Sequence, residues 1–262
     1  MDLQLKGLHV LVTGGSKGIG LACARGFLDE GARVTLVSRN PANLAAAQAS
    51  LGVDASRLAT VAADLCDAGA ALAALDAAEA GLGPVDILVN SAGAARRTPP
   101  DELQPEAWHA AMQAKYFSYI HMIDPLIKRM GQRGRGAIVN VVGNGGKVAS
   151  PIHLPGGAAN AALMLVSAGL AAAYGPRGVR VNAINPGLTL TDRLREGMAA
   201  DARLQQISPE LALQRAREKL PLGRLAEPEE IANAVLFLAS AKASYITGAI
   251  LAMDGAVTPM VV

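Results

Sequence analysis

The sequence is poor in aromatic residues and in cysteine. Phe, Tyr and Trp make up 3% of its 262 residues, and no basic stripe with interleaved aromatic side chains occurs, so a nucleic-acid partner is not expected. The net charge of +2 is too small to favour nucleic acid or an anionic membrane. The two cysteines, Cys23 and Cys66, lack the spacing of a metal site. They predict reduced, buried thiols in a cytoplasmic protein without a metal centre.

The sequence also lacks a signal-peptide pattern at its start, which reads MDLQLKGLHV, and we therefore expect a cytoplasmic location. One uncharged stretch, residues 156–175, is mostly Ala, Leu, Met, Val and Gly and is long enough to suggest a transmembrane helix. However, Asn160 and Ser167 interrupt the stretch, and strand-like segments flank it closely. We therefore expect a buried helix at a subunit interface and no membrane partner.

Hydrophobic residues, by contrast, are abundant at 51%, while charged residues reach only 18%. Much of this excess is Ala and Gly, which predicts helices packed closely on a sheet or on another subunit. The chain is long enough to bury a full core, and α/β folds of this size often form one domain. No repeat, low-complexity linker or charge block divides it, so one domain over residues 1–262 is expected.

A glycine-rich turn, TGGSKGIG at residues 13–20, follows an apolar run at residues 9–12 that predicts a buried strand. The glycines of this turn are Gly14, Gly15, Gly18 and Gly20. Glycine suits a turn that needs positive φ and a backbone that a phosphate can approach closely. An apolar stripe within residues 19–31 predicts a helix after the turn. Its N–H groups and dipole then form an anion site suited to a pyrophosphate; the alternative is a tight turn that binds nothing.

Short apolar strands and helices alternate along the rest of the chain. Further strands are expected at residues 33–38, 58–63, 85–89, 137–142, 179–184 and 250–253, and further helices at residues 41–51, 67–80, 105–130 with a kink at Pro125, 156–175 and 228–239. This alternation predicts an α/β Rossmann fold, a doubly wound parallel sheet of seven strands with helices on both faces. Residues 190–220 are polar and helical without a clear core face, which is typical of a lid over a site.

Over essentially its whole length the chain resembles the short-chain dehydrogenase/reductase family. Besides the glycine-rich turn, the matching motifs are Asp64-Leu65 after the third strand, Asn90-Ser91-Ala92-Gly93 after the fourth, Arg180-Val181-Asn182 on the sixth, Pro186-Gly187 after it, and Ile246-Thr247-Gly248 and Asp254-Gly255 near the end. The resemblance implies a dinucleotide cofactor, a small-molecule substrate, and a homo-oligomer, either a dimer or a tetramer.

The resemblance also implies which residues hold the dinucleotide. Asp64 and Leu65 would hold the adenine, and Asn90 and Ala92 would line the cofactor. Residues 186–189 would contact the nicotinamide amide. The expected cofactor-binding residues are Gly14, Ser16, Lys17, Gly18, Ile19, Gly20, Ser38, Arg39, Asp64, Leu65, Asn90, Ala92, Gly93, Asn160, Pro186, Gly187 and Thr189.

Charge at the end of the second strand favours NADP over NAD. A carboxylate there would accept a hydrogen bond from the ribose 2′-OH and repel a 2′-phosphate. Ser38 occupies this place, Arg39 follows it, and Lys17 adds a second cation nearby. We therefore expect NADP, with NAD as the other candidate. The alternative interpretation is two solvated basic side chains.

The catalytic tetrad that the resemblance implies is missing. In the family, a tyrosine protonates the carbonyl oxygen, a lysine four residues later lowers the tyrosine pKa and holds the ribose, a serine polarises the carbonyl, and an asparagine holds a water relay. By register, Gly156 stands in the tyrosine place, Asn160 in the lysine place, Gly143 in the serine place and Lys115 in the asparagine place. Because general acid catalysis contributes about 10²- to 10⁴-fold, ordinary Tyr/Lys chemistry is not expected.

Two other side chains are candidates for the catalytic groups, since no shift of the alignment brings a tyrosine such as Tyr119 into place. His153 lies in the loop that faces the nicotinamide in this fold, and an imidazole titrates in the useful range; the alternative is a surface histidine. Lys115 points toward the same space, where a desolvated amine could act as acid, oxyanion stabiliser or nucleophile; the alternative is a structural ion pair. Asn144 and Asn160 could hydrogen-bond the ribose or a substrate.

Three functions are therefore compatible with the sequence. The first is an NADP-dependent oxidoreductase on an organic carbonyl or alcohol, with Lys115 and His153 as the catalytic residues. The second is a catalytically inactive dinucleotide-binding protein, a sensor or scaffold. The third is a non-redox enzyme that reuses the pocket, such as a lyase or hydratase built on Lys115. Because one fold serves many activities, the resemblance alone does not decide between them.

Overall fold

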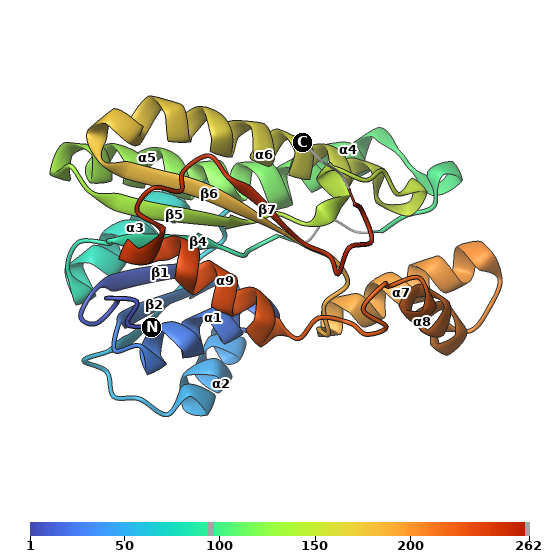
Figure 1. The fold of residues 1–262 in the computed structure, drawn as a ribbon, viewed down its shortest axis with the longest axis horizontal. Coiled ribbons are helices and arrows are strands. Elements are labelled where there is room, and N and C mark those ends of the chain that lie inside the picture. Colours follow the sequence, from blue (N-terminus) through green and yellow to red (C-terminus); the bar gives the residue numbers. More distant parts are fainter. Residues whose placement is uncertain (94–96, 260–262) are drawn as a thin grey trace.

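The computed structural model describes residues 1–93 and 97–259 and confirms the expected fold (Figure 1). Within these residues, seven parallel strands form one sheet in the order β3-β2-β1-β4-β5-β6-β7. Their bounds are β1 His9–Thr13, β2 Arg33–Ser38, β3 Leu58–Ala62, β4 Ile87–Asn90, β5 Gly136–Val141, β6 Val179–Pro186 and β7 Ile250–Met253. The strand order reverses between β1 and β4, as in other doubly wound sheets.

Helices cover both faces of this sheet. Figure 1 shows α1, α2 and α9 on one face and α3, α5 and α6 on the other. The α-helices of the described residues are α1 Gly18–Asp29, α2 Pro41–Leu51, α3 Ala68–Leu82, α4 Pro105–Ala111, α5 Ser118–Arg133, α6 Leu154–Tyr174, α7 Asp192–Gln205, α8 Pro209–Glu218 and α9 Pro228–Ala239. Each face has its own buried apolar cluster, so the sheet is the middle of three layers.

Local capping explains why several predicted boundaries are correct. The Asn40 side chain accepts a hydrogen bond from the Asn43 N–H, Pro41 occupies the first helical position, and Gly52 ends α2 with a φ of 66°. Likewise, the Asp67 side chain accepts a hydrogen bond from the Ala70 N–H at the start of α3. These are the signals that begin and end helices in sequence, so residues 41–51 form the predicted helix.

The long helix expected over residues 105–130 is the main correction. It divides into α4, a π-helical segment at Met112–Phe117 and α5, and the helix continues through Pro125. The π-helical segment thus lies before the proline, and the kink at Pro125 stays a prediction. At its end the Ser118 hydroxyl donates hydrogen bonds to the carbonyl oxygens of Ala114 and Lys115. π-helical segments often occur at functional sites, and this one carries Lys115.

Two further expectations need correction. Cys23 is fully buried, and burial raises its pKa to about 12, but Cys66 is only partly buried. Residues 190–220 do have a small apolar face, because Leu194 and Met198 of α7 pack on Leu220 and Leu225. Figure 1 shows α7 and α8 standing beside the sheet rather than on it.

The apolar stretch expected as a buried helix forms α6. Pro151–Arg177 is, by length and composition, the one helical segment of the described residues that is apolar enough to cross a membrane. Inside this protein, Leu163, Met164 and Ala171 of α6 belong to the core beneath it, whereas Leu165 is 74% exposed. The helix is thus a core helix with one apolar face left uncovered in the single chain.

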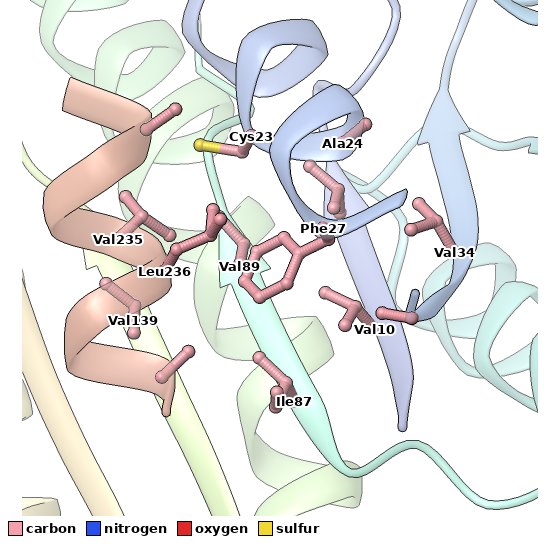
Figure 2. Packing of buried hydrophobic residues seen from close by; sticks show 14 of the residues in the cluster. Val10, Cys23, Ala24, Phe27, Val34, Ile87, Val89, Val139, Val235 and Leu236 are labelled. Carbon is pink, nitrogen blue, oxygen red and sulfur yellow. The ribbon is translucent and has the colours of Figure 1, made fainter. Parts of the chain in front are cut away.

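The core between the sheet and the α1/α9 layer is densely packed. Figure 2 shows Phe27 of α1 pointing toward Ile87 of β4 and Leu236 of α9. Phe27 is completely buried, as are Val10 and Val235 in the same cluster. A side chain in such surroundings contributes to stability through both transfer from water and close packing.

Replacing Phe27 by alanine is expected to lower the free energy of unfolding by about 3–5 kcal/mol, because the cavity left behind cannot fully close. Leu72→Ala on α3 is the control, since Leu72 is 41% exposed, and it should cost less than about 1 kcal/mol. Urea unfolding followed by circular dichroism, at equal protein concentration, measures both. Equal losses in the two variants would contradict this view of the core.

Candidate active site

A cavity of about 920 Å³ lies where β5 and β6 end, bounded on its outer side by α7 and α8. Parallel strands bring their carboxyl ends to one edge of the sheet, and loops at that edge form the binding sites of such folds. Six of the predicted cofactor-binding residues line this cavity: Ile19, Gly93, Asn160, Pro186, Gly187 and Thr189. The other eleven lie outside its lining: Gly14, Ser16, Lys17, Gly18, Gly20, Ser38, Arg39, Asp64, Leu65, Asn90 and Ala92.

The glycine-rich turn has the geometry that a phosphate needs. A Cβ on Gly20 would collide with the carbonyl oxygen of Gly14, and one on Gly14 would lie 2.8 Å from the Ala92 backbone. The N-cap of α1, Lys17, makes no side-chain hydrogen bond to the helix end. The backbone N–H groups there are therefore left for an anion, so the turn fits a pyrophosphate.

The end of β2 fits a phosphate on the ribose. The Ser16 hydroxyl donates a hydrogen bond to the Ser38 hydroxyl over 3.0 Å. Lys17 and Arg39 flank these two serines in the chain, and both are exposed. Two hydroxyl groups and two cations are suitable surroundings for a 2′-phosphate. The Asp64 carboxylate does not follow β2 but β3, one strand further along the sheet.

Buried polar side chains hold the loop after β4 in place. The Thr13 hydroxyl oxygen accepts hydrogen bonds from the N–H groups of Ser91 and Ala92 and donates one to Asn90. The Asn90 amide in turn donates a hydrogen bond to Asn140 of β5 over 3.0 Å. Asn90 is completely buried, so its side chain supports the loop, and Ser91 and Gly93 face the cavity.

The four positions assigned by register to the tetrad come together in the cavity lining. These are Lys115, Gly143, Gly156 and Asn160. A Cβ on Gly143 would lie 3.2 Å from the amide nitrogen of Asn160, so these two positions are neighbours. Asn160 is buried, and its side-chain oxygen has no hydrogen-bond partner among the described residues. A buried acceptor of this kind is normally paired, so the oxygen suits a ligand hydroxyl.

Lys115 reaches this site from the π-helical segment. Its amine donates hydrogen bonds to the Tyr119 hydroxyl and to the Val141 carbonyl oxygen, each over 3.1 Å. Within residues 1–93 and 97–259 no carboxylate pairs with it, so the expected alternative of a structural ion pair is wrong. Burial and, to a smaller extent, the nearby charge of Arg193 together lower the pKa of Lys115 to about 7.

Tyr119 also contributes to the candidate active site, which the sequence analysis did not predict. Its hydroxyl donates a hydrogen bond to the Val141 carbonyl oxygen over 2.8 Å, and the Lys115 amine lies 4.8 Å from its ring centre. The phenol is completely buried, and burial raises its pKa. Tyr119 therefore stays neutral and fixes the position of the amine. The signal was the spacing of four residues between the two side chains, which places them on one helix face.

His153 also faces the cavity, from the short 3₁₀ turn Pro151–His153. It is half-buried, and its Nδ1 has no partner among the described residues, unlike a solvated surface histidine. Burial, together with the charges of Arg97, Arg193 and Lys115, lowers its pKa to about 4. The expectation that this imidazole titrates in the useful range is therefore wrong: it is a neutral hydrogen-bonding group near pH 7.

Two arginines in the lining also escaped the sequence reasoning. Arg97 follows the loop after β4, and Arg193 lies in the first turn of α7. The sequence held no clear signal for them, because residues 190–220 carry six basic and five acidic side chains and Arg97 lies outside this segment. That segment includes Arg203, Arg215 and Lys219, which also line the cavity.

Comparison with known proteins gives consistent matches. Residues 14–258 match the sequence model of the enoyl-(acyl carrier protein) reductase family. The chain is 38% identical over 260 residues to D-threitol dehydrogenase from Mycolicibacterium smegmatis, covering 98% of this chain and 95% of that protein. It is 36% identical over 236 residues to the inactive 2-(S)-hydroxypropyl-CoM dehydrogenase 2 from Xanthobacter autotrophicus, covering 90% and 99%.

A solved structure is similar as well. The NADPH-bound short chain oxidoreductase from Pseudomonas aeruginosa PAO1, which contains an atypical catalytic center, superimposes with a TM-score of 0.86 at 34% identity. The match covers 98% of this chain and all of that one. The whole Rossmann fold, including α7 and α8, is therefore shared with a dinucleotide-binding protein.

The low pKa of Lys115 predicts a pH-dependent stability. Between about pH 7 and pH 10.5 the amine is neutral in the folded chain and protonated in the unfolded chain. The unfolded state therefore binds more protons, so the free energy of unfolding rises with pH over this interval. In Lys115→Met, the part of this pH dependence that comes from the amine should vanish. Urea unfolding of both proteins from pH 6.5 to 9.5 measures it, and a constant difference between them would contradict the desolvated amine.

Proposed function

Because this chain belongs to the short-chain dehydrogenase/reductase family, we propose that it is an NADP(H)-dependent oxidoreductase acting on an organic carbonyl or alcohol. The observation that carries the proposal is the Lys115 amine, which lies in the same cavity as Gly143, Gly156 and Asn160. A proton donor thus stands in a site where the expected tyrosine and serine positions hold glycine.

The NADPH-bound structural neighbour supports the expected cofactor, NADP. In this chain the Gly14 to Gly20 turn would hold the pyrophosphate, and Ser16, Ser38, Lys17 and Arg39 would hold the 2′-phosphate. When bound, the reduced nicotinamide supplies the hydride. NAD stays the other candidate, because the turn that fits the pyrophosphate serves both dinucleotides.

Lys115 would act as the general acid. As the carbonyl carbon gained the hydride that the bound cofactor would supply, the carbonyl oxygen would take a proton from the ammonium of Lys115. The amine is then neutral and regains a proton from water. A pKa of about 7 suits this task, because the group is partly protonated at neutral pH and readily gives up its proton. Tyr119 and Val141 orient the amine through their hydrogen bonds.

His153 and Asn160 would complete the site without titrating. The neutral imidazole offers one N–H group for polarising the carbonyl oxygen, the task of the missing serine. The unpaired side-chain oxygen of Asn160 would accept a hydrogen bond from the nicotinamide ribose, the task of the missing lysine. Residues 190–220, as α7 and α8, would close over the substrate as a lid.

A second function has its own support. One relative of this chain is an inactive dehydrogenase, and the site here has lost four expected groups. The second candidate is therefore a protein that binds the dinucleotide without hydride transfer. For either function we infer a cytoplasmic homodimer or homotetramer, in which a second copy covers the exposed apolar face of α6 around Leu165.

Arg39→Asp is expected to weaken NADPH binding by about 10- to 100-fold, because it replaces an attraction to the 2′-phosphate by a repulsion. NADH binding should stay the same or become tighter. Isothermal titration calorimetry with both cofactors measures this. Arg25→Ala removes an exposed arginine of α1 and should change neither affinity. Equal NADPH affinity in wild type and Arg39→Asp would place the 2′-phosphate elsewhere.

The reaction itself is tested by following NADPH absorbance with a panel of ketones. For the free enzyme, kcat/KM should be constant below about pH 7 and fall above it, because only protonated Lys115 can give a proton. Lys115→Ala should lose about 10²- to 10⁴-fold in kcat, with NADPH affinity preserved. Lys128→Ala, at an exposed ion pair with Asp124, is the control.

Other outcomes distinguish the alternatives. Tight NADPH binding without turnover of any substrate would favour the inactive dinucleotide-binding protein. Conversion of a substrate without consumption of NADPH would favour a lyase or hydratase built on Lys115.

A further inference from the structure

The charged groups around the cavity are predominantly positive. Its lining contains six cationic side chains, from Arg97, Lys115, Arg193, Arg203, Arg215 and Lys219. Three acidic side chains also line it, from Glu196, Asp201 and Asp254. Asp254 is occupied by hydrogen bonds from the Asn144 amide and the Thr258 N–H. A cleft with low-dielectric walls and an excess of one charge attracts ligands of the opposite charge.

Arg97 lies deep enough in this cleft to need a counter-charge. Its guanidinium packs on Gly197 of α7, where a Cβ would lie 3.0 Å from three of its atoms. Glycine at this position therefore leaves the space that the guanidinium fills. Arg97 donates no hydrogen bond to the described residues. Burial lowers its pKa, and Asp201 offsets this only through its charge.

Arg193 brings a second guanidinium to the same end of the cavity. It donates a hydrogen bond to the carbonyl oxygen of Gly93. The Lys115 side chain passes so close to Gly93 that a Cβ there would collide with it. The guanidinium is therefore near the amine. The positive charges of Arg97, Arg193 and Lys115 all act on His153, so the three cations converge on one region.

We propose that this region binds an oxyanion carried by the substrate itself, so that the substrate is a ketone or alcohol bearing a carboxylate, phosphate or sulfonate group. Arg97 and Arg193 would hold the anion, because a guanidinium presents N–H groups in a planar fork that matches such oxygens. Lys115 and His153 would then face the carbonyl group of the same molecule. The inference rests on the proposed reduction, since it names the substrate class of that site.

The cofactor does not account for these arginines. Its pyrophosphate fits the backbone N–H groups at the start of α1, and its 2′-phosphate fits Ser38 and Arg39 at the end of β2. Arg97 contacts α7 at Gly197, next to the loop that carries His153: the Thr98 N–H donates to the Ile152 carbonyl oxygen over 2.9 Å. This is the side of the cavity at which a substrate would meet Lys115.

The test compares matched pairs of ketones that differ in charge. The pairs are levulinate with methyl levulinate, dihydroxyacetone phosphate with dihydroxyacetone, and acetonylsulfonate with acetonyl methyl sulfone. NADPH consumption gives kcat and KM for each, and calorimetry gives the affinity of each for the enzyme bound to NADP⁺. The three pairs separate a carboxylate, a phosphate and a sulfonate. For at least one pair, the anionic member should have a kcat/KM and an affinity at least about tenfold higher.

Three variants give the residue-level control. Arg97→Gln and Arg193→Gln should each raise KM and weaken binding of the preferred anionic ketone by about 10- to 100-fold, and leave the affinities for the neutral partner and for NADPH unchanged. Arg97→Lys should restore only part of the loss, because it keeps the charge without the fork. Arg195→Gln on the same helix, at an exposed pair with Asp192, should behave like wild type.

Different results would contradict the oxyanion site and the proposed oxidoreductase function. Turnover of neutral ketones at least as efficient as that of their anionic partners, unchanged in Arg97→Gln and Arg193→Gln, would overturn the oxyanion site and leave the oxidoreductase intact. Binding of an anionic ketone that is lost in both variants, without any turnover, would support the oxyanion site and overturn the oxidoreductase. Loss of NADPH binding in the variants would mean that the arginines serve the cofactor, and would also overturn the oxyanion site.

Discussion

The parallel hydrogen bonding of the central strands is the constraint on which the site depends. Because β1, β4, β5 and β6 run in one direction, the loops that follow them open at one edge of the sheet. Thr13, Asn90 and Asn140 then lock the three central strands together at this edge through buried side-chain hydrogen bonds. The loops at this edge form one side of the cavity, and α7 and α8 form its outer wall.

The unusual property of the cavity is the Lys115 amine, which no carboxylate of residues 1–93 and 97–259 neutralises. Hydrogen bonds to two neutral oxygens, from Tyr119 and Val141, hold the amine in place but do not compensate its charge. The cost of desolvation therefore appears as a low pKa. In the proposed reaction, this low pKa would let a residue type that is ordinarily charged give up a proton near neutral pH.

Arg97 is a related case, because the only acidic group that acts on it is Asp201, through its charge and without a hydrogen bond among the described residues. Like charges brought together in a partly desolvated space raise the energy of the empty site, and an anionic ligand relieves it. Arg97 owes its position to Gly197 on α7, and Arg193 begins the same helix. A movement of α7 would therefore change the charge of the cavity and its access together. Helix α7 would thus determine both the access to the cavity and its preference for an anionic substrate.

The sequence by itself determined the strands, most helix ends and the glycine-rich turn, because caps such as Asn40 and Asp67, apolar alternation and glycine spacing are local signals. It also placed Lys115, Gly143, Gly156 and Asn160 in one site. Only the tertiary structure decided that Lys115 has no acidic partner among the described residues, that Tyr119 orients it, that His153 is neutral near pH 7, and that a π-helical segment precedes Pro125. Burial, pKa and contacts between distant segments depend on what packs around a side chain, and no local pattern records that.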